Sequence, residues 1–165
     1  MKKKDRDCVL LCDIQGELFQ KSVSDLNMSS ETFVRRFMNS NIAEEFDNVF
    51  FLEDTKSIKN IFDDLDKQYG SSNYGSVKYS SDVMYWVGYL YRQFAYCYDI
   101  SSKRAYHYLP LSYVASTYDA YHTLDISLAI ERLLEARGIS FDPDYLNKKG
   151  LELLRKMRLE QKQTN

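Results

Sequence analysis

Residues 82–98 read DVMYWVGYLYRQFAYCY and contain the only tryptophan of the chain. One apolar stripe recurs there with the period of an α-helix, at Val83, Trp86, Val87, Leu90 and Phe94. Aromatic residues also occupy most of the other positions, so we predict a helix that is buried nearly all round at the centre of the fold. Gly88 in its middle costs about 1 kcal/mol of helix propensity relative to alanine, which suggests that another helix crosses closely at this point.

Tyrosine is concentrated around this segment, because all but one of the 14 tyrosines lie between Tyr69 and Tyr121. A tyrosine ring fills a core or an interface, whereas its hydroxyl needs a hydrogen-bond partner when it is buried. By helical phase, some of these residues join the buried layer around the tryptophan and others fall outside the apolar stripe. The second set provides the candidate partner-binding residues: Tyr85, Tyr89, Tyr96, Tyr118 and Tyr121.

The remaining pattern predicts an all-α protein, a compact bundle of about seven to eight helices around helix 82–98. Only 2 prolines and 6 glycines interrupt the 165 residues, as expected of a largely helical chain. We divide the chain by composition into four parts. These are an acidic helical N-terminal subdomain at 1–69, a loop at 70–79, a tyrosine-rich helical core at 80–140, and a C-terminal helix with a basic tail at 141–165.

Helix ends are predicted from capping residues. Helix starts are expected near Ser29, Asn41, Thr55, Ser80, Ser101, Pro110 and Asp125, and Gly138 stands where a helix-ending glycine belongs. The apolar run at 49–52 fits either a strand or a buried link. A last helix should follow Pro143, with the apolar side chains Leu146, Leu151, Leu154 and Met157 facing inward.

The composition narrows the function classes. With 44% hydrophobic and 28% charged residues and a net charge of −2, the chain has the profile of a globular protein and not of a strongly basic nucleic-acid binder. A DNA-binding transcription regulator remains an alternative, because Arg35 and Arg36 within 32–38 fit part of a helix-turn-helix. An odd cysteine count without a secretory signal predicts a reduced, cytoplasmic location, and no segment is apolar enough to span a membrane.

Candidate catalytic and metal-ligating groups are sparse. Phosphate-binding loops, HExxH and dinucleotide fingerprints are absent. Cys8 and Cys12 share a helix face and invite a metal site with His107 or His122, but buried structural thiols are the favoured interpretation, and we expect no metal or cofactor. His122 pairs with Asp119 in the enzyme alternative; the favoured role is a backbone hydrogen bond that fixes the turn before the next helix.

Three acids cluster near the end of a predicted helix, at Asp63, Asp64 and Asp66. The helix macrodipole disfavours negative charge at that end. These carboxylates are therefore candidates for a basic patch on a partner, although a solvated helix face also explains them. Together with His122 and the five tyrosines, they complete the predicted partner-binding set.

Two stretches, SSKRAYHYL at 101–109 and YDAYHTLD at 118–125, are followed by Ala129-Ile130-Glu131. Over about residues 82–137 the chain resembles a family of short helical proteins from Firmicutes-type bacteria, often encoded beside toxin-like genes. The resemblance implies an antitoxin-like or accessory binding role. We therefore predict a non-enzymatic, cytoplasmic protein-binding domain whose partner is another protein, such as a toxin-type protein, and leave homo-oligomerisation open.

Overall fold

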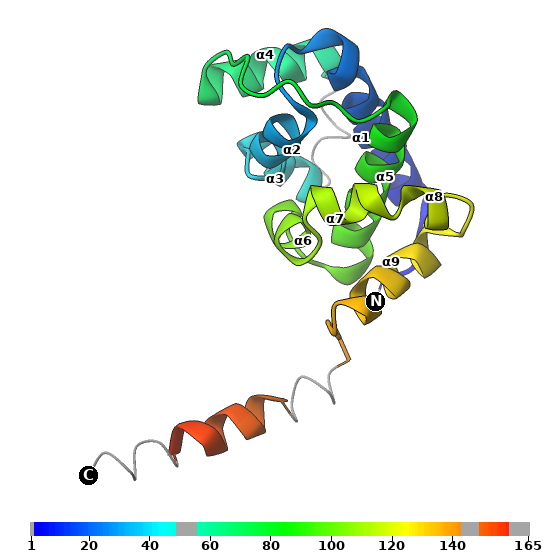
Figure 1. Cartoon of the computed structure of the whole chain (residues 1–165), viewed down its shortest axis with the longest axis vertical. Helices are drawn as coiled ribbons and strands as arrows, with labels where there is room; N and C mark the ends of the chain where they lie inside the picture. The colour runs from blue at the N-terminus through cyan, green and yellow to red at the C-terminus, as the bar shows by residue number, and fades with distance from the viewer. Residues whose placement is uncertain (1, 49–55, 143–148, 159–165) are drawn as a thin grey trace.

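A computed structural model describes residues 2–48, 56–142 and 149–158, and every regular element in these ranges is a helix (Figure 1). The labelled helices are α1 (Arg6–Asp25), α2 (Ser30–Met38), α3 (Asn41–Asp47), α4 (Ile58–Tyr69), α5 (Ser81–Tyr98), α6 (Ser102–Tyr108), α7 (Leu111–Ser116), α8 (Tyr118–Tyr121) and α9 (Ile126–Ala136). Residues 149–158 form a further helix. The all-α prediction is confirmed, and the helices outnumber the predicted seven to eight partly because the chain breaks at Thr117 between α7 and α8.

Helix α5 is the buried centre of the fold, as predicted. It begins after Ser80, whose hydroxyl accepts from the backbone N–H of Val83 at 3.3 Å. Side chains on all its faces are buried, and the Tyr91 ring is completely enclosed with its hydroxyl donating to the carbonyl of Leu109. Helices α1, α6, α7 and α9 all pack against it. Burial of this helix therefore supplies much of the apolar surface removed from water on folding.

The close crossing predicted at Gly88 is formed by α1. A Cβ atom at Gly88 would lie 2.6 Å from the carbonyl oxygen of Gln15 and 2.9 Å from Cγ of Phe19. The buried amide of Gln15 donates through Nε2 to the carbonyl of Gly88 at 3.0 Å. Gly16 makes the reciprocal approach, since its Cβ would lie 2.9 Å from the Tyr85 ring. Only residues without a side chain allow the two backbones to come this near.

Arg92 lies outside the apolar stripe of α5, and its side chain is only 1% exposed. Its Nη2 donates to Oδ1 of Asp47 at 2.6 Å, and the same carboxylate accepts the backbone N–H of Ser102 at 2.8 Å and its hydroxyl at 2.7 Å. A buried guanidinium needs such a partner because an unpaired buried charge is very costly. The cluster ties together α3, α5 and the start of α6.

Most predicted helix ends are observed, with two corrections. Ser29, Ser101 and Asp125 accept capping hydrogen bonds, and Gly138 has a φ of +63° after α9. Helix α3 is capped by Ser40 instead of Asn41, because the Ser40 hydroxyl reaches the N–H of Ala43. Helix α4 is capped by Ser57 and not by Thr55, which lies outside the described residues, as does the run 49–52.

Residues 70–80 connect α4 to α5 without regular structure, in agreement with the predicted loop. The loop is attached to the α1–α2 corner. The backbone N–H of Ser29 donates to the carbonyl of Tyr74 at 3.1 Å, and Lys78 donates to the carbonyl of Val23 at 2.7 Å. These bonds hold the loop across the beginning of α2. The division of the chain into subdomains stays a prediction.

The C-terminal helix contradicts its predicted packing. Leu151, Leu154 and Met157 were expected to face inward, but each is more than half exposed, as is Leu153. Leu146 lies outside the described residues. Figure 1 shows helix 149–158 beyond the end of α9 and apart from the packed helices. Helical periodicity identified its apolar face correctly, but periodicity does not say what covers that face.

Replacing Gly88 with alanine should destabilise the protein. The added methyl would meet the Gln15 carbonyl and the Phe19 ring, and overpacking of this kind costs about 1–3 kcal/mol, which outweighs the gain of about 1 kcal/mol in helix propensity. Urea unfolding followed by circular dichroism measures the change. Gly150→Ala is the matched control, because a Cβ there meets nothing within 4 Å. Equal stability of the two variants would contradict the proposed crossing.

Replacing Arg92 with methionine should lower the free energy of unfolding by roughly 3–5 kcal/mol, because Asp47 would lose its buried countercharge. The control is Lys2→Met, which breaks the Lys2–Asp99 pair, whose side chains are 59% and 76% exposed. An exposed pair contributes little, so this variant should unfold like the wild type. Thermal unfolding of the two variants side by side makes the comparison, and a tolerated Arg92→Met would refute the assigned role.

Candidate functional site

Three of the predicted anchor tyrosines lie along the seam between α1 and α5. The Tyr85 hydroxyl donates to Oδ1 of Asp13 at 3.0 Å, and the Tyr96 hydroxyl donates to Oδ2 of Asp5 at 2.7 Å. The Tyr89 ring lies under the ammonium group of Lys4, 5.0 Å from its centroid. These side chains are half-buried, and each is engaged by a charged residue from the N-terminal part of the chain.

This arrangement changes the acidity of the phenols. Burial, followed by the hydrogen bond to Asp13, raises the pKa of Tyr85 to about 12. The hydrogen bond to Asp5, followed by burial, raises the pKa of Tyr96. A phenol that donates to a carboxylate must keep its proton, so both contacts favour the neutral tyrosine. The hydroxyls of Tyr85 and Tyr96 are therefore already hydrogen-bonded within the protein and do not offer a donor to a partner.

The three cysteines lie under this seam. Cys8, Cys12 and Cys97 are all buried and unpaired, with the sulfur atoms of Cys8 and Cys12 3.9 Å apart. The hydrogen bond with Cys8 and burial raise the pKa of Cys12, and burial raises that of Cys97 to about 11. Raised pKa values keep these two thiols protonated, whereas the hydrogen bond with Cys12 lowers the pKa of Cys8. The cluster fits the favoured interpretation of cysteines as small buried hydrophobes.

A metal centre finds no support in this cluster. Both histidines offered as further ligands are exposed, whereas Cys8 and Cys12 are completely buried. Within residues 2–48, 56–142 and 149–158, no group of three or more histidine, cysteine or acidic side chains has the geometry to hold a metal ion.

The second aromatic group surrounds α8. The Tyr118 ring contacts Trp86 edge-on at 5.6 Å and stacks on His122 at 4.6 Å. Nδ1 of His122 lies 2.8 Å from the carbonyl oxygen of Tyr118, so a hydrogen bond to the backbone is observed, whereas the role of this histidine in the turn before α9 stays a prediction. Tyr121 packs against the core, and Asp119 is exposed. The alternative of an Asp119–His122 catalytic pair gains no support, because the histidine contacts that are observed go to Tyr118.

The predicted acidic residues lie on α4. Asp64 accepts from Lys67 at 2.8 Å and lies 3.7 Å from Lys56, and the hydrogen bond from Lys67 lowers its pKa. Asp66 accepts from the hydroxyl of Ser71 at 3.0 Å, and Asp63 is exposed. Two of the three carboxylates thus have partners within their own part of the chain.

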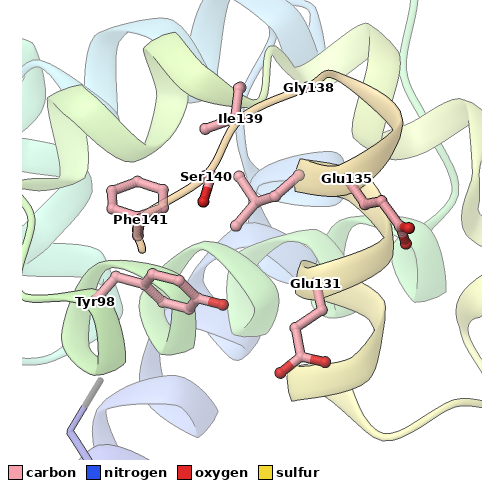
Figure 2. A pocket seen from close by; sticks show the side chains of 8 residues that line it. Tyr98, Glu131, Glu135, Gly138, Ile139, Ser140 and Phe141 are labelled. Carbon is pink, nitrogen blue, oxygen red and sulfur yellow. The ribbon is translucent and has the colours of Figure 1, made fainter. Parts of the chain in front are cut away.

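An open acidic pocket of about 390 Å³ lies where the chain leaves α9. Figure 2 shows the rings of Tyr98 and Phe141 on one side of it and the carboxylates of Glu131 and Glu135 on the other. Gly138 allows the sharp reversal that brings Phe141 back against α5, where it contacts Phe94 at 5.8 Å. This turn forms one side of the pocket, and the exposed side chains of Glu131 and Glu135 line the other.

A larger groove of about 610 Å³ lies between α2 and α6, and sequence reasoning missed it. It is lined chiefly by cationic and aromatic side chains: Arg35, Asn39, Lys103, Arg104, Tyr106, His107 and Tyr108. Most of them belong to the stretch SSKRAYHYL, which drew attention only through the family resemblance. Arg35 belongs to α2, Asn39 follows the last residue of α2, and Pro110, which also lines the groove, follows α6. No local sequence signal connects the two helices.

Arg35 and Arg36, the two residues of the DNA-binding alternative, lie in different surroundings. Arg35 lines the α2–α6 groove. Arg36 donates to the carbonyl of Gly70 at 2.7 Å and lies over the ring of Tyr69, 5.6 Å from its centroid. One of the two guanidinium groups is thus already bound within the protein.

A comparison with protein-family models, with curated proteins and with solved structures found no match. The resemblance over residues 82–137 therefore stays a prediction. In the part of the chain that the structure describes, no helix has the length and apolar character needed to cross a membrane.

The Tyr85–Asp13 bond predicts a loss of stability at alkaline pH. Because the folded pKa of about 12 exceeds the ordinary value of 10.0, the contribution of Tyr85 is complete below pH 10 and disappears as the pH rises through 12. Tyr85→Phe should flatten this decline, and Asp13→Asn should reduce it partly because burial remains. Urea unfolding between pH 8 and pH 12, with phenolate absorbance as a second signal, tests both variants. If the free energy of unfolding of Tyr85→Phe falls with pH as steeply as that of the wild type, Tyr85 is not the group responsible.

Proposed function

We propose that this protein is a non-enzymatic protein-binding domain and that helix 149–158 is the element that enters its partner. The observation that carries the proposal is the exposure of four large apolar side chains on this short helix. Leu151, Leu153, Leu154 and Met157 are 55–57% exposed. Exposed apolar residues that gather on one element mark interaction sites much more often than single exposed residues do.

The four side chains share one face of the helix. Spacings of three and four residues relate Leu151 to Leu154, Leu154 to Met157, and Leu153 to Met157, and such positions are neighbours on a helix surface. Glu152, Arg155 and Lys156 occupy the opposite face. A helix with this division binds by laying its apolar face in a hydrophobic groove.

The charge of the helix indicates the chemistry of the groove. Arg155 and Lys156 lie on the face opposite the apolar side chains together with the acid Glu152, and Arg158 follows Leu154 by four residues at the C-terminal end of the apolar face. A partner with an apolar groove and an acidic rim would complement both features, and complementary charge speeds association and excludes wrong partners. The partner class that the family resemblance implies, a toxin-type protein, belongs to this proposal, as does a cytoplasmic location, which the three free thiols support.

The tyrosines first considered as anchors have a secondary place in the proposal. The hydroxyls of Tyr85 and Tyr96 are bound to Asp13 and Asp5. The Tyr118 ring contacts Trp86 edge-on and stacks on His122. Binding energy at interfaces concentrates in groups that become fully desolvated on binding. The leucines of helix 149–158 have more surface left to bury than these rings.

The test compares Leu151→Glu/Leu154→Glu with Glu152→Gln/Lys156→Gln in affinity capture from native lysate, quantified by mass spectrometry. The amount of partner captured by the leucine variant should fall by about tenfold or more, because each leucine buried on binding contributes about 1.5–3 kcal/mol. The polar-face control should retain it. Both variants should melt like the wild type, since the mutated side chains are exposed.

Two results would contradict the proposal. One is a set of captured proteins that does not depend on Leu151 and Leu154. The other is a marked fall in melting temperature for the leucine variant alone, which would mean that the helix packs on its own protein. Light scattering on the same samples shows whether the partner is a second copy of the chain, which would appear as a wild-type dimer lost in the leucine variant.

A further inference from the structure

The groove between α2 and α6 gathers positive charge in a protein whose net charge is −2. Arg35 enters it from α2, and Lys103 and Arg104 enter it from the first turn of α6. Among the described residues, none of these three cations forms an ion pair, whereas Lys2, Lys56, Lys67 and Arg92 each do. Like charges that converge without a counterion repel one another, so an anion in the groove would relieve them.

One of these cations is already oriented. Nη2 of Arg104 donates to the hydroxyl of Tyr108 at 3.0 Å, and its guanidinium lies 5.8 Å from the centroid of the same ring. Tyr108 is itself fixed, because its ring packs against Phe94 and Phe141 in the core. A guanidinium carries five N–H donors in a rigid plane, so this contact leaves others for a phosphate.

The second turn of α6 adds an aromatic wall. The exposed His107 ring lies 6.2 Å from the Tyr108 ring at an angle of 60°. His107 stands four residues after Lys103, so the two side chains lie on the same face of the helix, with the cation on the preceding turn. The lining of the groove therefore combines cations with the exposed ring of His107.

One acid, Glu31 on α2, contacts the lining residue Tyr106. Its carboxylate accepts from the Tyr106 hydroxyl at 2.9 Å, which holds Tyr106 at the edge of the groove. Its single charge is opposed by three permanent cations: Arg35, Lys103 and Arg104. The potential in the groove is therefore positive, despite the acidic balance of the whole chain.

We propose that this groove binds a mononucleotide. The phosphates would lie against Arg35, Lys103 and Arg104, and the base would lie against the ring of His107. Planar guanidinium groups match phosphate oxygens, and aromatic side chains stack on any base. The volume of about 610 Å³ is in the range of small-molecule sites. This site is separate from helix 149–158, so the body of the protein and its C-terminal helix bind different ligands.

Isothermal titration calorimetry at low salt with ADP, pyrophosphate and adenosine as probes tests the site. ADP should bind the wild type at one site, and pyrophosphate should bind more weakly. Arg35→Gln/Lys103→Gln should weaken ADP binding by about tenfold or more, because each change removes a charge-assisted contact to the phosphates. His107→Ala should weaken the binding of ADP and leave the binding of pyrophosphate unchanged. This difference separates the role of the histidine ring from that of the cations.

The matched control is Lys21→Gln/Lys59→Gln, which removes the same charge from exposed positions on α1 and α4. It should bind ADP like the wild type. The proposal is overturned if the wild type shows no saturable heat with ADP, or if the control and the groove variant weaken ADP equally. It is also overturned if an acidic peptide binds this groove and ADP does not. Melting temperatures of all variants confirm that each is folded.

Discussion

The contact on which the rest of the structure depends is the crossing of α1 and α5 at Gly88. No Cβ keeps the two backbones apart there, and the buried amide of Gln15 donates to the Gly88 carbonyl at 3.0 Å. A central helix that is buried nearly all round must be packed against along its whole length, and this crossing sets how closely α1 packs on it. The cysteine cluster and the bonds of Tyr85 and Tyr96 follow along the same seam.

Polar groups complete the core in a second way. The guanidinium of Arg92 and the carboxylate of Asp47 are held together with Ser102, so three helices share one network of charge-assisted hydrogen bonds. Such a network restricts the alternatives that a purely apolar interface would allow. The hydroxyls of Tyr85, Tyr96 and Tyr106 are likewise held within the protein, by Asp13, Asp5 and Glu31.

The two surfaces proposed for binding are both cationic, although the chain carries a net charge of −2. Helix 149–158 combines leucines with arginine and lysine, and the α2–α6 groove combines arginine and lysine with aromatic rings. Local arrangement of charge, and not the net value, decides which ligands approach a surface. Other acids lie away from these two surfaces: Asp64 on α4 is paired with lysines, and Glu131 and Glu135 line the pocket at the end of α9.

The sequence by itself determined the all-α class, the central helix, most helix ends and the close approach at Gly88, because periodicity, capping residues and a glycine in a helix act locally. Only the tertiary structure decided which side chains meet. In the folded protein Arg92 is buried against Asp47, and Leu151 and Leu154 are exposed. Arg35 and Lys103, from different helices, line the same groove. These outcomes depend on contacts between residues far apart in the chain, and a pattern along one helix shows that a face exists without showing what lies against it.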